Sequence, residues 1–148
     1  MNLRSILVPV LLCVAMSASA QEQKFKAQTL VKDAVAYGKA NGREALLKEV
    51  SSGKFRVTAA NDLYVFIYDK TGVCIGMGYQ AGLVGVNRWG LKDPDGKMIV
   101  QELIKTAQTQ KSGWVDYKYI NPKTGKIEPK SSYVEALDDW LVGCGFYK

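Results

Sequence analysis

The chemistry open to this chain is limited first by the absence of histidine from its sequence. Histidine is the commonest general base and metal ligand, so serine and cysteine nucleophiles lack their usual partner. Paired carboxylates remain in Asp138-Asp139 and in Asp93-Pro94-Asp95-Gly96. Neighbours along a strand point to opposite faces, which separates the first pair, and the second sequence lacks the longer series of oxygen ligands that a calcium loop needs. We therefore predict no catalytic residue, no metal site and no cofactor.

Two tyrosines and two cations form the strongest candidate site. Alternation along the strand-like residues 113–120 places Tyr117 and Tyr119 on one face. A buried phenol needs a hydrogen-bond partner, so both hydroxyls could bond to the backbone as ordinary core residues. Alternatively, two phenols and a nearby cation would hold a carboxylate by charge-assisted hydrogen bonds. The candidate cations are Arg88, in a predicted loop, and Lys130, at the start of the next strand. The residues alone leave both interpretations open.

The elements that must position these residues follow from periodicity. We predict helices over 24–51, with a break near Asn41, and over 97–110, and strands over 62–70, 73–79, 113–120, 132–137 and 139–147. The strand 62–70 is apolar on both faces, which is typical of a central strand. This order predicts an α+β fold in which the long N-terminal helix packs on one face of a five-stranded antiparallel sheet. The glycine-rich connection, residues 80–96, would cross the other face and enclose a cavity.

The first twenty residues are typical of a secretion signal. Arg4 precedes an apolar stretch, residues 6–16, and Ala18 and Ala20 form an A-x-A cleavage sequence. The apolar stretch is about half of the ~20 residues that a membrane-spanning helix needs. We therefore expect cleavage after Ala20, a periplasmic or secreted protein, and one domain over residues 21–148. Loss of Arg4 lowers the formal charge from +6 to +5. Because the lysines are dispersed, we expect an anionic metabolite and no nucleic acid as partner.

Several short sequences of the second half resemble one family. They are Gly113-Trp-Val-Asp-Tyr117, Asn121-Pro122, Pro129-Lys-Ser-Ser-Tyr-Val134 and Trp140-Leu-Val-Gly-Cys-Gly-Phe-Tyr147, with the turn Asp69-Lys-Thr-Gly72 and the segment 85–96 before them. In order and spacing they resemble the single Cache domains, PAS-like sensor domains that lie outside the membrane in many chemoreceptors and sensor kinases. The resemblance covers nearly all of residues 21–148. It implies the strand order 2-1-5-4-3, with strands numbered along the chain.

The resemblance also implies a ligand site. Cache domains of this type commonly bind small organic acids or related metabolites between the sheet and the connecting loop. The matching positions in this chain are Arg88, Trp89, Tyr117, Lys130 and Tyr133. Many relatives carry a histidine in the second strand where residues 76–78 are Gly-Met-Gly, and the chain has no flanking membrane helices or output domain. It therefore resembles a freestanding Cache domain with a ligand of its own.

These observations predict a periplasmic sensor module that binds a small organic acid or related metabolite. It would signal through a separate membrane partner, such as a sensor kinase or chemoreceptor. The alternative is an interaction or regulatory subunit of an envelope complex that binds no ligand, which a closed apolar core at Tyr117 and Tyr119 would favour. We do not expect an enzyme, because no nucleophile is accompanied by a base or a metal site.

The implied strand order bears on Cys74 and Cys144. The first strand would lie between them and separate their backbones by about two strand spacings, roughly 9.5 Å. That distance exceeds the ~7 Å limit for a disulfide. We therefore predict two buried free thiols.

Overall fold

The fold is an antiparallel sheet with helices on both faces. A computed structural model describes residues 9–58 and 62–148, with side chains from residue 19 onward. Its helices are α1 (Pro9–Asn41), α2 (Arg43–Ser51) and α3 (Ile99–Gln110), and its strands are β1 (Arg56–Val57), β2 (Leu63–Tyr68), β3 (Cys74–Met77), β4 (Ser112–Ile120), β5 (Ile127–Leu137) and β6 (Trp140–Tyr147). A 3₁₀ turn, η1 (Ala81–Leu83), lies between β3 and α3.

The sheet has the predicted strand order with one strand added. Its order is β1-β2-β6-β5-β4, and β3 also pairs with β2. The path β3-β2-β6-β5-β4 confirms the order 2-1-5-4-3. The short β1 pairs with Leu63 and Tyr64 at the start of β2, whereas β3 pairs with residues 66–68. The central position of β2 agrees with the burial of all six of its residues.

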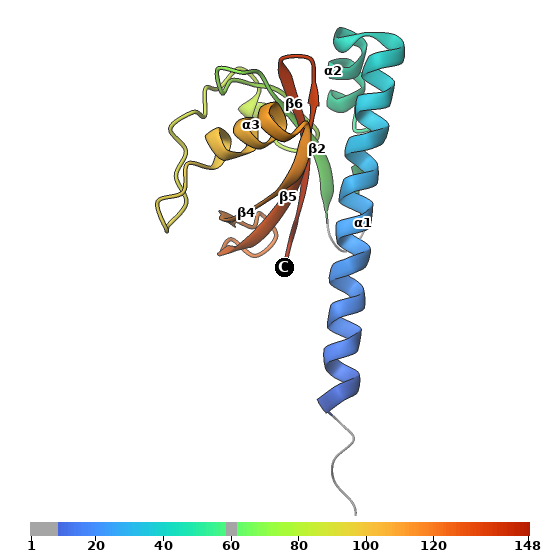
Figure 1. The fold of residues 1–148 in the computed structure, drawn as a ribbon, viewed down its shortest axis with the longest axis vertical. Helices are drawn as coiled ribbons and strands as arrows, with labels where there is room; N and C mark the ends of the chain where they lie inside the picture. Colours follow the sequence, from blue (N-terminus) through green and yellow to red (C-terminus); the bar gives the residue numbers. More distant parts are fainter. Residues whose placement is uncertain (1–8, 59–61) are drawn as a thin grey trace, which may run out of the picture.

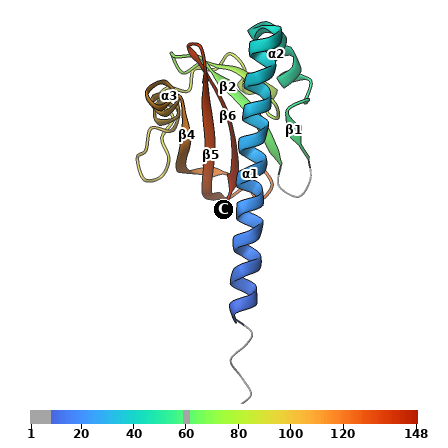
Figure 2. The ribbon, with the colours of Figure 1, turned by 45° about the vertical axis from the view of Figure 1, so that its right-hand side comes forward.

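Two layers cover the two faces of this sheet (Figures 1 and 2). The long α1 and the short α2 lie on one face, and α3 with the loops on either side of it lies on the other. Side chains of β2 alternate between the layers. Val65 and Ile67 belong to the core beneath α1, while Phe66 and Tyr68 belong to the core beneath α3. The two-sided apolar pattern of β2 therefore serves two separate cores.

The boundary between α1 and α2 lies where the sequence predicts it. Helix α1 ends at Asn41 and α2 begins at Arg43. Gly42 between them has a φ of 94°, a conformation that residues with a Cβ rarely adopt. Along α1, Ala27, Val31 and Ala34 recur at spacings of four and three and are fully buried. This stripe fixes the helix against the sheet.

Two boundaries differ from the prediction by five residues or more. Helix α1 begins at Pro9, not near Lys24, because residues 10–23 contain no glycine or proline and continue the helix. Strand β5 begins at Ile127, not at Ser132, because its pairing with β4 continues down to the pair Ile120–Ile127. The predicted signal peptide falls largely outside the residues whose side chains are described.

Both paired-carboxylate sequences form turns. Asp138, with a φ of 54°, and Asp139 connect β5 to β6. Oδ1 of Asp93 accepts hydrogen bonds from the backbone N–H groups of Asp95 and Lys97, at 3.0 and 2.9 Å. In the described part of the chain, no group of three or more acidic or cysteine residues could hold a metal ion.

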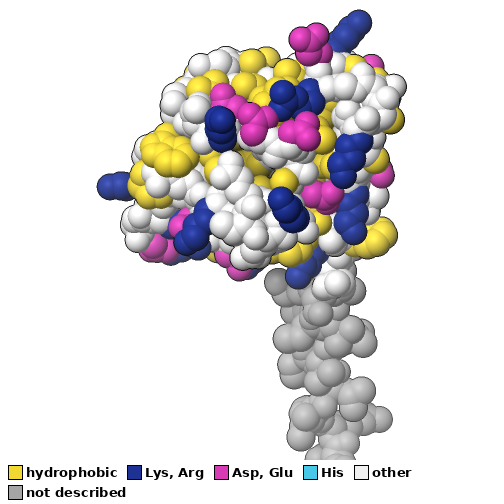
Figure 3. Space-filling view, turned by 45° about the horizontal axis from the view of Figure 1, so that its top comes forward, with side chains coloured by type: hydrophobic (Ala, Val, Ile, Leu, Met, Phe, Trp, Pro, Cys, Tyr) yellow, Lys and Arg dark blue, Asp and Glu magenta, His cyan; other side chains and the backbone are white. Residues whose placement is uncertain are grey.

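The surface carries charges of both signs. On the face shown in Figure 3, Lys and Arg side chains lie among Asp and Glu side chains and exposed apolar groups. None of the helices in the described residues is both long enough and apolar enough to span a bilayer.

Cys74 and Cys144 are buried free thiols, as predicted. Cys74 pairs with Tyr68 and Cys144 with Val65, on opposite edges of β2. Their side chains also lie in different cores, on opposite faces of the sheet. Burial raises the pKa of the Cys144 thiol to about 12. Both thiols should therefore be unreactive in the folded protein.

We expect titration of the exported protein, denatured without reductant, to find two thiols from residues 21–148. The native protein should react slowly, because both sulfur atoms are buried. Tryptic mapping after alkylation identifies the two cysteines. A disulfide-linked peptide pair would contradict the strand arrangement described above.

Candidate functional site

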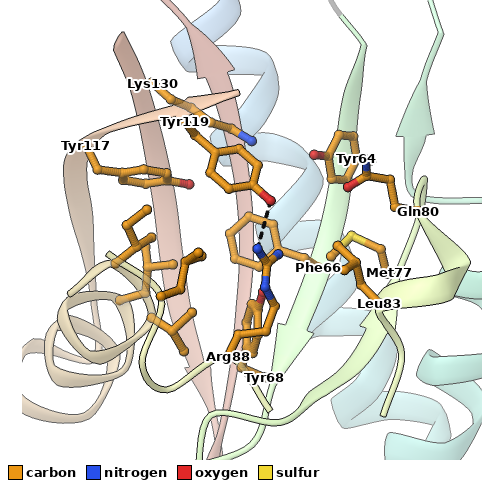
Figure 4. A pocket seen from close by; sticks show the side chains of 14 residues that line it. Tyr64, Phe66, Tyr68, Met77, Gln80, Leu83, Arg88, Tyr117, Tyr119 and Lys130 are labelled. Carbon is orange, nitrogen blue, oxygen red and sulfur yellow. Dashed lines mark hydrogen bonds between the residues drawn. The ribbon is translucent and has the colours of Figure 1, made fainter. Parts of the chain in front are cut away.

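A pocket lies between the sheet and the layer formed by α3 and the loop after β3 (Figure 4). It encloses about 380 Å³, part of which is continuous with solvent. The lining residues are Tyr64, Phe66, Tyr68, Met77, Gln80, Leu83, Arg88, Leu91, Ile99, Val100, Leu103, Tyr117, Tyr119 and Lys130. The lining is mainly aromatic and aliphatic, with a few polar groups among the apolar ones, which is the usual composition of a small-molecule site.

Lys130 of β5 is the most unusual residue of the pocket. It is only 3% exposed, and its ammonium lies over the rings of Tyr64, Tyr119 and Tyr147 at 5.0 to 5.3 Å from their centroids. Gly145 on the neighbouring strand makes room for it, since a Cβ there would lie 2.7 Å from Cε of Lys130. None of the hydrogen bonds or ion pairs in the described part of the chain involves this ammonium. Aromatic faces are thus its immediate neighbours.

Burial changes the pKa of several groups in the pocket. It lowers the pKa of Lys130 to about 8 and raises that of Tyr68 to about 12. The pKa of Tyr117 also rises through burial, although its hydroxyl shares a hydrogen bond with Oγ of Ser132 at 2.8 Å. At neutral pH, Lys130 is therefore mostly charged and the phenols keep their protons. All of them can donate hydrogen bonds.

Arg88 supplies a second cation from the loop. Its Nη2 donates a hydrogen bond to the hydroxyl of Tyr119 at 3.0 Å, and its guanidinium lies 5.6 Å from the centroid of that ring. The backbone N–H of Arg88 donates to the carbonyl of Gly72 at 2.8 Å, which fixes the loop against the β2–β3 turn. Figure 4 shows Arg88 and Lys130 approaching Tyr119 from opposite sides.

The lining contains two cations and four phenols but no carboxylate. In the dry part of a protein a charge without a counterion is costly, so a site of this composition favours an anion. Ammonium, guanidinium and phenol groups all donate hydrogen bonds to carboxylate oxygens. The geometry therefore suits a small carboxylate.

Comparisons with known proteins identify the family. The model of the family described as single Cache domain 2 matches residues 13–148. The chain belongs to this family. Its members are extracytoplasmic sensor domains and not a family of enzymes. The fold agrees, since the structure superposes on the periplasmic sensor domain of a chemotaxis protein with a TM-score of 0.67 and 25% identity, covering 86% of this chain and 96% of that one.

Two further relatives are informative. A solved Cache chemosensory domain that recognises carboxylic acids matches with a TM-score of 0.66 and 23% identity, with 90% of this chain and 95% of that chain covered. The sensor histidine kinase MctS of Rhizobium johnstonii is 38% identical over 106 residues, or 70% of this chain. This Cache domain spans 23% of the length of that kinase.

The structure brings together Arg88, Tyr117, Tyr119 and Lys130 in the pocket of this Cache domain. Trp89 and Tyr133 lie elsewhere, and the alternation of extended backbone explains both cases.

Trp89 follows Arg88, whose side chain points into the pocket. The side chain of Trp89 points away from the pocket and is 44% exposed, and its backbone lies close to Gly72. Tyr133 is three residues from Lys130, so it points to the opposite face. There it packs on Trp114 and bonds to Glu135. We therefore leave Trp89 and Tyr133 out of the proposed site.

Sequence reasoning missed the contribution of β2 to the pocket. Tyr64, Phe66 and Tyr68 form its wall opposite β4. Their shared face was visible in the alternation of β2. Both faces of β2 are apolar, because one packs beneath α1 and the other faces the pocket. The alternation therefore does not show which of the two faces lines the pocket.

Proposed function

We propose that this Cache domain is a periplasmic sensor module whose pocket binds a small carboxylate. A separate membrane-bound kinase or chemoreceptor would recognise the ligand-bound domain. The observation that carries the proposal is the buried ammonium of Lys130, which has aromatic rings around it and no carboxylate within the pocket lining. We propose no catalytic role.

A carboxylate would bridge the two cations. One oxygen would accept from Lys130 and the other from Arg88 or Tyr119, whose hydroxyl already lies between them. The hydroxyl of Tyr117 would donate a hydrogen bond to the ligand while accepting one from the hydroxyl of Ser132. The aliphatic side of the pocket, made by residues of α3, would hold a short hydrocarbon chain.

The relatives support both parts of the proposal. The similar chemosensory domain recognises carboxylic acids, and MctS is a sensor histidine kinase. An interaction subunit that binds no ligand would be expected to have a closed apolar core at this place. The pocket lining instead contains two cations, Arg88 and Lys130. We therefore favour the sensor over the interaction subunit.

A thermal-shift screen of short mono- and dicarboxylates, amino acids and purines tests the proposal. A ligand at a hundred times its dissociation constant stabilises a fold by about 2.7 kcal/mol, which for a domain of this size raises the melting midpoint by very roughly 10 °C. The amide of each acid, at matched salt, is the control, since it keeps the shape and removes the charge. A panel in which no acid exceeds its amide would refute carboxylate binding.

The proposed location requires export. We expect the protein isolated from the periplasm to begin at Gln21, because Ala18 and Ala20 form the cleavage sequence. Intact-mass measurement decides the question. A mass that includes residues 1–20 would show that the leader is retained.

A further inference from the structure

The β4–β5 hairpin ends in an exposed apolar pair. Ile120 and Ile127 face each other across the two strands and are 49% and 59% exposed. Between them, Asn121–Lys126 turn the chain with two lysines, Lys123 and Lys126. The carboxylate of Glu128 accepts hydrogen bonds from Asn121 and Thr124 within the hairpin, at 2.6 and 3.0 Å. The tip thus combines a cross-strand isoleucine pair with two lysines and one carboxylate.

Hydrogen bonds hold the end of the hairpin in one conformation. The N–H of Asn121 donates to the carbonyl of Lys126 at 2.8 Å, and the hydroxyl of Tyr147 donates to the carbonyl of Ile120 at 2.7 Å. The isoleucines are therefore held outward, with little conformational freedom left to lose on contact with a partner.

The hairpin lies at the end of the domain from which α1 projects (Figures 1 and 2). Residues 19–22 of α1 are exposed and Ala27 is buried, so the helix leaves the domain between them. Phe25, 69% exposed and flanked by Lys24 and Lys26, lies in that stretch. The same end of the molecule therefore carries a second apolar group between lysines. The part of the pocket loop that carries Val84 and Val86 bonds to the backbone of Cys74, which pairs with Tyr68 at the far end of β2.

We propose that the β4–β5 hairpin docks this domain onto an anionic lipid bilayer. Ile120 and Ile127 would enter the interface, and Lys123 and Lys126 would lie among the phosphates. Apolar side chains beside lysines are the composition that binds the headgroup region of anionic membranes. This orientation leaves Val84 and Val86 of the pocket loop away from the bilayer. The inference does not depend on the ligand of the pocket.

Co-sedimentation of the exported protein with phosphatidylglycerol–phosphatidylcholine vesicles tests the proposal. We expect binding that weakens with added salt and is absent from pure phosphatidylcholine. Ile120→Ser with Ile127→Ser should weaken binding about 30-fold, since two half-inserted side chains are lost. Lys123→Gln with Lys126→Gln should weaken it about tenfold or more and reduce the salt dependence. All four substitutions are at exposed positions, so unchanged melting midpoints would confirm that the variants fold.

The pocket loop offers matched controls. Val84 and Val86 are 45% and 43% exposed, so Val84→Ser with Val86→Ser removes an equal number of exposed aliphatic groups. This variant should bind within about twofold of the parent. Equal losses in both variants, a larger loss in the control, or no binding of the parent to phosphatidylglycerol vesicles would each overturn the proposal.

A label gives a direct measure of contact. An environment-sensitive dye on Ile127→Cys should shift to the blue on adding the anionic vesicles, and the same dye on Val86→Cys should not. The buried Cys74 and Cys144 stay unlabelled under native conditions. A shift at Val86→Cys without one at Ile127→Cys would place the membrane contact on the pocket loop.

Discussion

Replacing Lys130 by methionine should abolish the rise in melting midpoint that a carboxylate produces, without lowering the midpoint of the unliganded domain. The ligand loses the buried cation that neutralises it, and a charged ligand without its partner in a dry site pays for desolvation alone. We expect a loss of at least 100-fold in affinity, or about 3 kcal/mol, the scale of a broken buried ion pair.

In the absence of ligand, the same substitution should increase the free energy of unfolding. The pKa of Lys130 falls from 10.5 to about 8 through burial, so keeping the ammonium charged costs about 3 kcal/mol relative to water. Methionine removes that cost and has a similar length, so it fills the space above Gly145. The three aromatic contacts that are lost offset part of the gain.

Lys105→Met is the matched control, because Lys105 is exposed on α3 and makes the same change of charge. Calorimetric melting with and without the strongest acid of the screen measures both effects. A ligand shift that survives in Lys130→Met would mean that the carboxylate binds elsewhere. A large fall in the unliganded midpoint would mean that Lys130 stabilises the fold and is not held in readiness for an anion.

The two hairpins were predictable from local turns, whereas the pairing of the distant strands β2 and β6 followed only from the family resemblance. The two-sided apolar pattern of β2 places it in the middle, and short turns at Asp69–Gly72 and Asp138-Asp139 make each neighbour antiparallel. The missed β1 has only two residues, Arg56 and Val57, and shows no alternation that could reveal it. The helix start was missed because residues 1–20 were assigned to a leader and the helical periodicity was followed only from Lys24. A leader and a helix share the same apolar, alanine-rich composition.

The site was predictable only in part because its members come from distant segments. Tyr117 and Tyr119 share a face by simple alternation, and Lys130 follows because it pairs directly with Tyr117. Its aromatic neighbours Tyr64 and Tyr147 lie on β2 and β6, and only the strand order brings them to one place. Which of two alternating faces meets the cavity is decided by the packing of α1, and no local pattern encodes it.

The affinity for a carboxylate should be nearly constant from pH 6 to about pH 8 and then fall, approaching tenfold per pH unit. A carboxylate ligand is fully ionised throughout, since such groups titrate near pH 4. Lys130, whose pKa burial lowers to about 8, is the group that loses its charge in this window. The phenols nearby do not interfere, since burial raises the pKa of Tyr64, Tyr117 and Tyr147.

The same prediction can be stated as the number of protons that the protein takes up when the carboxylate binds. Because the bound anion favours the ammonium, binding at pH 8 should take up about half a proton, and binding at pH 6 almost none. Isothermal titration calorimetry in buffers of different ionisation enthalpy measures this number directly. For the unliganded protein, raising the pH has the opposite effect, because it stabilises the fold. The folded pKa of Lys130 lies below its unfolded value of 10.5, so the unfolded chain holds more protons above pH 8 and the free energy of unfolding rises with pH from there.

Lys130→Arg separates charge from geometry in this pH window. Arginine stays protonated well above pH 10, so a variant that still binds should keep its affinity between pH 8 and pH 9.5, where the parent loses about tenfold or more. The lysine-specific rise in unliganded stability should also vanish from the variant. If the parent binds its carboxylate equally well at pH 7 and pH 9.5 and takes up no proton at pH 8, the anion is held by Arg88 alone. Lys130 is then a buried cation whose role lies in the fold.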